Sequence, residues 1–114
     1  MGGKDLGKTS TGMQPNVAAL LSYLIGFITG IIFYMIEKEN KFVRFHAMQS
    51  IIAFGALTIA YWIFGFIPFL NLIAYPVLGA LGLILWIILM VKAYQGQMFK
   101  LPVIGDIAEK QVGK

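Results

Sequence analysis

Residues 45–91 read FHAMQSIIAFGALTIAYWIFGFIPFLNLIAYPVLGALGLILWIILMV, and none of these 47 residues is Lys, Arg, Asp or Glu. As one helix this stretch would be roughly 70 Å long, whereas the hydrocarbon core of a bilayer is only about 30 Å thick. Pro68, Asn71 and Pro76 interrupt it near its middle, where proline is poorly tolerated inside a helix and a polar residue favours a turn. We therefore expect two transmembrane helices, at about 47–67 and 72–94, joined by a tight hairpin.

The composition of the whole chain agrees with a membrane location. Apolar residues make up 59% of the sequence and charged residues 12%, and the mean hydropathy is +0.80. A surface of this composition could not be kept in water. With 114 residues the chain allows one domain, and its lack of cysteine rules out disulfides, thiolate metal sites and a cysteine nucleophile. The predicted fold class is all-α, in an integral membrane protein.

A third span is expected before the pair. Residues 17–36 are twenty positions without charge, about the length needed to cross a bilayer. This stretch is too long for the apolar part of a signal peptide and is not followed by a small-residue cleavage site. We expect a flexible tail at 1–16, a three-span membrane domain at 17–94 and a cytoplasmic amphipathic tail at 95–114.

The distribution of basic residues predicts the orientation of such a three-span path. Seven Lys and Arg residues fall on the side of the first loop and the C-terminal tail, against Lys4 and Lys8 on the other side. Positive charge is retained in the cytoplasm, so we expect a multi-pass protein of the cell membrane with its N-terminus outside and its C-terminus cytoplasmic. The basic residues beside the spans are expected to contact anionic lipid headgroups, and no basic stripe suits nucleic acid.

Small residues recur at positions where helices could pack closely. The first span carries four of them at i+4 spacing, and the third span offers two glycines: Ala18, Ser22, Gly26 and Gly30, then Gly79 and Gly82. Aligned small residues let helix backbones approach each other in a membrane. Their partner is either another span of the same chain, which is the simpler interpretation, or a helix of a second copy or of another membrane protein.

No catalytic or cofactor site can be assembled from the sequence. Residues 2–9 fit the phosphate-binding expression of Gly, four residues, Gly, Lys and Thr, but neither a preceding strand nor an adjoining helix is expected, so we do not expect nucleotide binding. A lone histidine is a poor metal site. We expect no enzyme activity and no cofactor.

The polar segment between the first two spans concentrates the remaining chemistry. If a helix begins near Lys41, then His46, Gln49 and Ser50 share a face. These side chains and Arg44 either form a cytoplasmic patch for a partner or a phosphate, or serve only to anchor lipid headgroups and neighbouring helix ends. We favour the anchoring interpretation.

This segment also carries a family resemblance. Residues 40–50, NKFVRFHAMQS, and residues 101–109, LPVIGDIAE, resemble a family of small, largely uncharacterised bacterial and archaeal membrane proteins. That family is regarded as distantly similar to the twenty-kilodalton Tic subunit of the chloroplast inner-envelope import translocon, which has four spans. Within the matching motifs, Arg44, His46, Gln49 and Asp106 are the candidate functional residues. The tail is expected to form a short surface helix with an Asp106–Lys110 pair, which could dock against the segment around His46.

Two functions remain open from the sequence. The first is a scaffold or a protein-translocation-related membrane subunit, which the resemblance implies and which acts through helix packing and the polar cytoplasmic rim. The alternative is a homo-oligomeric passive channel or small transporter. The spans contain no ionisable side chain for coupled transport, but hydroxyls such as those of Ser22, Thr29 and Thr58 could line a passive pore.

Overall fold

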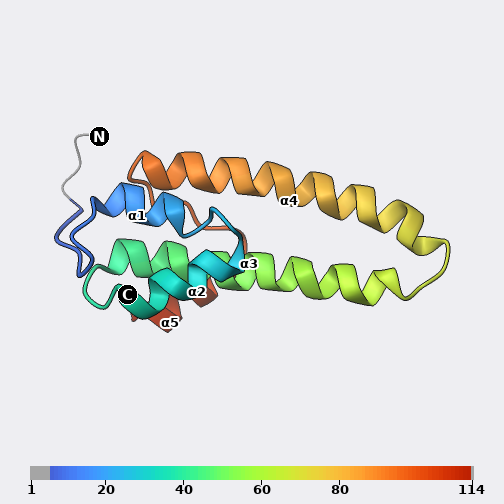
Figure 1. The fold of residues 1–114 in the computed structure, drawn as a ribbon, viewed down its shortest axis with the longest axis horizontal. Coiled ribbons are helices and arrows are strands. Elements are labelled where there is room, and N and C mark those ends of the chain that lie inside the picture. The colour runs from blue at the N-terminus through green and yellow to red at the C-terminus, as the bar shows by residue number, and fades with distance from the viewer. Residues whose placement is uncertain (1–5, 114) are drawn as a thin grey trace.

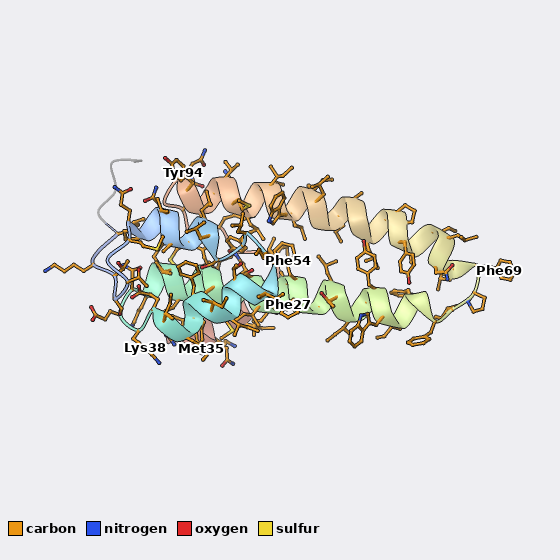
Figure 2. The ribbon with its side chains drawn as sticks, viewed as in Figure 1. Phe27, Met35, Lys38, Phe54, Phe69 and Tyr94 are labelled. Carbon is orange, nitrogen blue, oxygen red and sulfur yellow. The ribbon has the colours of Figure 1, made fainter. Side chains whose placement is uncertain are left out.

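The computed structural model describes residues 6–113, and these residues form helices, turns and loops (Figure 1). The helices are α1 (Pro15–Leu21), α2 (Phe27–Ile36), α3 (Lys41–Gly65), α4 (Leu70–Tyr94) and α5 (Ile104–Val112). α3 and α4 form a long antiparallel hairpin, and the three shorter helices gather around its open end (Figure 1). Phe69 lies at the closed tip of the hairpin, whereas Tyr94 and Lys38 lie at the open end (Figure 2).

α3 and α4 confirm the prediction of two long apolar helices joined by a tight hairpin. Each has 25 residues, which gives a length of about 37 Å, and each is apolar enough to cross a membrane. The chain reverses between Gly65 and Leu70, where Asn71 donates a hydrogen bond from Nδ2 to the Gly65 carbonyl. Pro76, which was expected to mark the reversal, instead lies within α4. α3 begins earlier than expected because the Asn40 side chain accepts a hydrogen bond from the Val43 amide and caps the helix.

The prediction of one continuous helix over residues 17–36 is wrong. The chain leaves the helix after α1 and resumes it at α2, and Gly26 lies between them at φ +58° and ψ −135°. The backbone groups freed by this break are bound by side chains: Thr29 Oγ accepts from the Ile25 amide and donates to the Ser22 carbonyl. Trp86 donates from its indole to another freed carbonyl, that of Tyr23. The described residues therefore contain two helices of membrane-spanning length, α3 and α4.

α1 and α2 form a short hairpin that enters between the long helices and returns (Figure 1). At the start of α1, Asn16 donates a hydrogen bond to the carbonyl of Tyr94, the last residue of α4. At the turn, the Gly26 carbonyl accepts a hydrogen bond from Ser50, ten residues into α3. α2 then runs back along α3 to the end of the hairpin from which α1 came (Figure 1). Residues 15–36 consequently do not reach the closed tip.

The described ends of the chain lie together at the open end of the α3–α4 hairpin. The Ser10 amide donates to the Glu37 carboxylate at 2.8 Å, and Lys41 Nζ donates to the Gly113 carbonyl at 3.2 Å. Both contacts are beside the start of α3. An N-terminus outside and a C-terminus in the cytoplasm would instead require the two ends to be on opposite sides.

The expected flexible N-terminal tail makes hydrogen bonds to the loop before α3 where the structure describes it. Residues 1–5 lie outside the described part of the chain. From residue 6 onward, Asn40 donates from Nδ2 to the Leu6 and Lys8 carbonyls, and the Leu6 side chain packs against the core. Residues 6–14 are therefore held across the loop between α2 and α3.

Candidate functional site

The polar side chains near the start of α3 point into the protein. His46, Gln49 and Ser50 are fully buried. Tyr23 comes from the break between α1 and α2, and its hydroxyl lies 2.6 Å from His46 Nδ1. Gln49 Nε2 donates to the same hydroxyl at 3.0 Å. A tyrosine that accepts from an amide and donates to an imidazole has both roles of its hydroxyl filled.

The same network binds the segment that follows α4. His46 Nε2 lies 2.8 Å from the Gln97 carbonyl oxygen, which can only accept, so Nε2 carries the proton and Nδ1 accepts from Tyr23. Gln49 donates to the Phe99 carbonyl at 2.9 Å and accepts from the Leu101 amide at 2.9 Å. His46 and Gln49 thus hold residues 97–101 along α3, and we call the three side chains of Tyr23, His46 and Gln49 the buried clamp.

Arg44 binds the end of α2. Its Nη1 donates to the carbonyls of Tyr34 at 3.0 Å and Glu37 at 2.6 Å, and the guanidinium lies 4.0 Å from the centre of the Tyr34 ring. A cation at the C-terminus of a helix is favourable because that end carries unpaired carbonyls and a partial negative charge. The anchoring interpretation of Arg44 therefore fits its contacts, which are to a helix end.

Asp106 lies apart from these residues. It is exposed on α5 and pairs with Lys100 at 3.7 Å, and Lys100 also binds Glu109 at 3.0 Å. The hydrogen bond from Glu109 raises the pKa of Lys100. The recorded partner of Asp106 is Lys100, whereas the sequence predicted Lys110. The expected docking of the tail near His46 is confirmed, since α5 packs on α3.

Glu37 is a second centre of hydrogen bonding, which the sequence did not single out. It is fully buried, and its carboxylate accepts from the amides of Ser10, Glu39 and Asn40 at 2.8–3.1 Å. Burial alone would raise the pKa of this carboxyl, but these N–H donors outweigh it and hold the pKa below its usual value. Tyr23 was also missed, because one tyrosine in an apolar stretch carries no distinguishing signal. Glu37 could have been found from its position at the end of an apolar stretch, where an acidic residue is conspicuous.

The four small residues of the first predicted span do not form the single face that was expected. The break in the helix places Ala18 and Ser22 with α1 and Gly30 in α2, so their i+4 spacing no longer aligns them. Gly30 does pack closely on another span of the same chain: a Cβ there would lie 2.8 Å from the Ala47 carbonyl oxygen of α3.

The two glycines of α4 also face α3. A Cβ at Gly79 would lie 3.0 Å from Tyr61 Oη, and a Cβ at Gly82 would lie 3.5 Å from Leu57 Cδ1. For these glycines and for Gly30, the intrachain interpretation of the small residues therefore agrees with the contacts.

The chemistry available at this site is that of a structural clamp. Among the described residues, no three His, Cys, Asp or Glu side chains gather in a way that could hold a metal ion. The His46 ring has both nitrogens engaged inside the protein, and Gln49 has both its oxygen and its nitrogen engaged. The observed contacts join the turn between α1 and α2, the start of α3 and the C-terminal segment.

Comparison with known proteins places this architecture in a family. Residues 9–108 match the MamF/MmsF family, described as the magnetosome magnetite crystal formation protein family. A UPF0132 membrane protein of Methanocaldococcus jannaschii is 53% identical over 105 residues, which cover 92% of this chain and 94% of the relative. A UPF0132 membrane protein of Archaeoglobus fulgidus is 48% identical over 101 residues, covering 89% and 98%.

These matches do not show the expected similarity to the twenty-kilodalton Tic subunit, and no solved structure was found to match. They do support the expected kinship with small archaeal membrane proteins of unknown function. The chain belongs to the MamF/MmsF family, and its relatives include the UPF0132 membrane proteins of archaea.

Proposed function

We propose that this protein is a membrane scaffold subunit that binds an apolar transmembrane helix of a partner. In this proposal α3 and α4 cross the bilayer, and the hairpin of α1 and α2 enters the membrane and returns to the same side. All charged residues lie outside residues 45–91, and thus away from the closed tip of the hairpin. Because positive charge is retained in the cytoplasm, both described ends are placed there.

The observation that carries the proposal is an unfilled groove between α3 and α4. Near the closed tip it forms a cavity of about 430 Å³ lined by Tyr61, Trp62, Gly65, Phe66 and Tyr75. A second cavity of about 440 Å³ shares Tyr61 with the first and continues to the turn between α1 and α2. The short helices occupy the other end of the α3–α4 hairpin and leave this stretch uncovered (Figure 1).

The floor of the groove suits a helix. Gly79 and Gly82 from α4 line the second cavity, opposite Leu57 and Thr58 of α3. Helices associate in lipid through close packing on small residues, because apolar surface alone provides no driving force there. Of the 25 residues of α4, the buried ones are Leu89 and Ala93, both near its end, so the rest of the helix has little cover from its own chain. The proposed partner is a second copy or another membrane protein, including a subunit of a protein-translocating complex.

A passive channel finds less support. The hydroxyls that were candidates for a pore lining donate to backbone carbonyls: Ser22 to Ala18 at 3.0 Å and Thr58 to Phe54 at 2.8 Å. Thr29 likewise donates to the Ser22 carbonyl. Hydroxyls bonded within their own segments are poor substitutes for the hydration shell of an ion.

The proposal does not extend to the magnetite crystal formation in the family's description. Glu37 directs its carboxylate oxygens to backbone amides, and Asp106 and Glu109 pair with Lys100. These carboxylates are therefore already engaged with donors of their own chain.

A pair of glycine substitutions tests the groove. Gly79→Leu places a side chain in the second cavity, where its Cβ would also lie 3.0 Å from Tyr61 Oη, whereas Gly55→Leu places the same side chain where nothing lies within 4 Å of a Cβ. Each protein is released from its own cells in lipid nanodiscs and examined by native mass spectrometry. We expect the parent and Gly55→Leu to be released as a defined complex and Gly79→Leu to be released as a single chain.

Two results would count against this function. Release of the parent protein as a monomer would contradict a scaffold role. Retention of the complex by Gly79→Leu, with correct insertion, would show that the groove is not the contact surface.

A further inference from the structure

α3 lies between two surfaces that differ in polarity, at the same position along its axis. Ala47 faces α2, and Gln49, two residues further and therefore about 200° around the helix, faces the C-terminal segment. On the α2 side the exposed side chains are apolar, such as Met35 at 63% exposure. On the other side Lys100 joins its two carboxylates. The α5 side therefore suits lipid headgroups and the α2 side suits lipid chains.

A cavity opens on the α5 side, between the first turns of α3 and the C-terminal helix. It has a volume of about 340 Å³ and is lined by Lys41, Phe45, Met98, Glu109 and Val112. Most of this lining is apolar, and the ammonium of Lys41 is its one cationic group. The cavity thus combines a positive charge with an apolar floor.

The charges around the cavity leave it attractive to an anion. Lys100 Nζ lies 3.0 Å from Glu109 and 3.7 Å from Asp106, so this one ammonium compensates the two carboxylates in part, and the positive charges of Lys41 and Lys110 exceed what is left. Among residues 6–113, Lys41 Nζ donates to the Gly113 carbonyl, which carries no net charge. Lys110 adds a further exposed cation on α5. An ammonium group of this kind is a common phosphate ligand.

Exposed apolar side chains in the same C-terminal segment, outside the lining of the cavity, fit the boundary between headgroups and chains. Val103 is 69% exposed and Ile107 is 43% exposed, beside the charged residues of α5. A helix with basic and apolar groups together lies at this boundary in an anionic membrane.

We propose that this cavity binds one anionic phospholipid, with its phosphate at Lys41 Nζ and the start of one chain over Phe45, Met98 and Val112. The proposal relies on the membrane placement given above but not on a partner helix. Gly79→Leu should therefore leave lipid binding unchanged, which distinguishes a failure here from a failure of the scaffold role.

The test uses the full chain in nanodiscs of equal parts phosphatidylglycerol and phosphatidylcholine, with retained lipid counted by native mass spectrometry. We expect the parent protein to retain one phosphatidylglycerol in preference to phosphatidylcholine. Lys41→Gln should reduce that preference about fivefold, since one lysine near an anionic surface contributes about 1 kcal/mol. Lys38→Gln removes an exposed lysine that does not line the cavity and should leave the preference intact.

A second variant addresses the floor of the cavity. Met98→Glu places a carboxylate at a partly exposed position of the lining and should also reduce the preference. Thermal unfolding in detergent should show that both variants remain folded.

Equal retention of the two lipids by the parent protein, or equal losses in Lys41→Gln and Lys38→Gln, would overturn the proposal. Inorganic phosphate added to the detergent-solubilised protein identifies the source of the phosphate. Binding of that ion through Lys41, without retention of phosphatidylglycerol, would overturn the lipid assignment.

Discussion

At the scale of single residues, the side chain of Gln49 binds two backbone groups of the C-terminal segment. Gln49→Leu would remove the partners of the part-buried Phe99 carbonyl and of the buried Leu101 amide. An unpaired buried backbone group costs about 1 to 3 kcal/mol, so we expect a lower unfolding temperature in detergent and faster proteolysis after α4. Gln95→Leu, at an exposed position, is the matched control. Equal behaviour of the two variants would argue against the buried clamp.

Glu37 predicts a pH dependence whose sign follows from its pKa. The folded protein lowers the pKa of this carboxyl below the usual 4.5, so the unfolded chain binds the proton more readily. The stabilisation is therefore complete above about pH 4.5 and is lost as the pH falls through the folded pKa. Glu37→Gln should lower the free energy of unfolding at pH 7 by about 1 to 3 kcal/mol. It should also reduce the loss of stability that the parent protein shows between pH 7 and acid pH. An unchanged loss of stability at acid pH would contradict this role.

At the scale of elements, the contact between α2 and α3 depends on the absence of a side chain at Gly30. Gly30→Ala would bring a methyl group to 2.8 Å from the backbone oxygen of Ala47. Because backbone cannot move as a flexible side chain can, we expect a loss of about 1 to 3 kcal/mol in thermal unfolding. Gly55→Ala meets nothing within 4 Å and should be neutral or stabilising. A stabilised Gly30→Ala would mean that the two helices are further apart.

α4 and α5 both begin after a tight turn that follows a proline. Val103 has φ +64° and ψ −53°, and the Ile104 amide donates to the Pro102 carbonyl; Phe69 has a closely similar turn. This backbone conformation is strained, above all for a β-branched residue. Val103→Gly should raise stability by about 1 kcal/mol in thermal unfolding, whereas Val112→Gly, within α5, should lower it by a similar amount. Destabilisation by both would refute the strain at Val103.

The sequence predicted some of these elements and missed others for physical reasons. An uncharged run too long for one crossing has to reverse, and Asn71 marked the place, so the hairpin of α3 and α4 could be predicted. The break between α1 and α2 could not be predicted, because hydropathy carries no information about which groups bind the backbone at a helix break. The partners that stabilise the break are Thr29 nearby and Trp86 on a distant helix. His46 and Gln49 were recognised as candidates because they lie in the polar segment, whereas Tyr23 was not, because it lies in an apolar stretch.

At the scale of the whole molecule, the number of crossings decides between the two arrangements. Two crossings with a returning hairpin place both described ends on one side, whereas three crossings would place the N-terminus with the closed tip. The chain contains no cysteine, so a single introduced cysteine reports one position. Gln14, Lys110 and Phe69 are exposed at the N-terminal segment, α5 and the tip, respectively.

The most direct measurement labels Gln14→Cys, Lys110→Cys and Phe69→Cys with a membrane-impermeant maleimide, in sealed vesicles of known orientation and again after permeabilisation. We predict that Gln14→Cys and Lys110→Cys are labelled from the same side and Phe69→Cys from the opposite side. Labelling of Gln14→Cys together with Phe69→Cys, and of Lys110→Cys from the other side, would contradict the returning hairpin and restore the three-span arrangement.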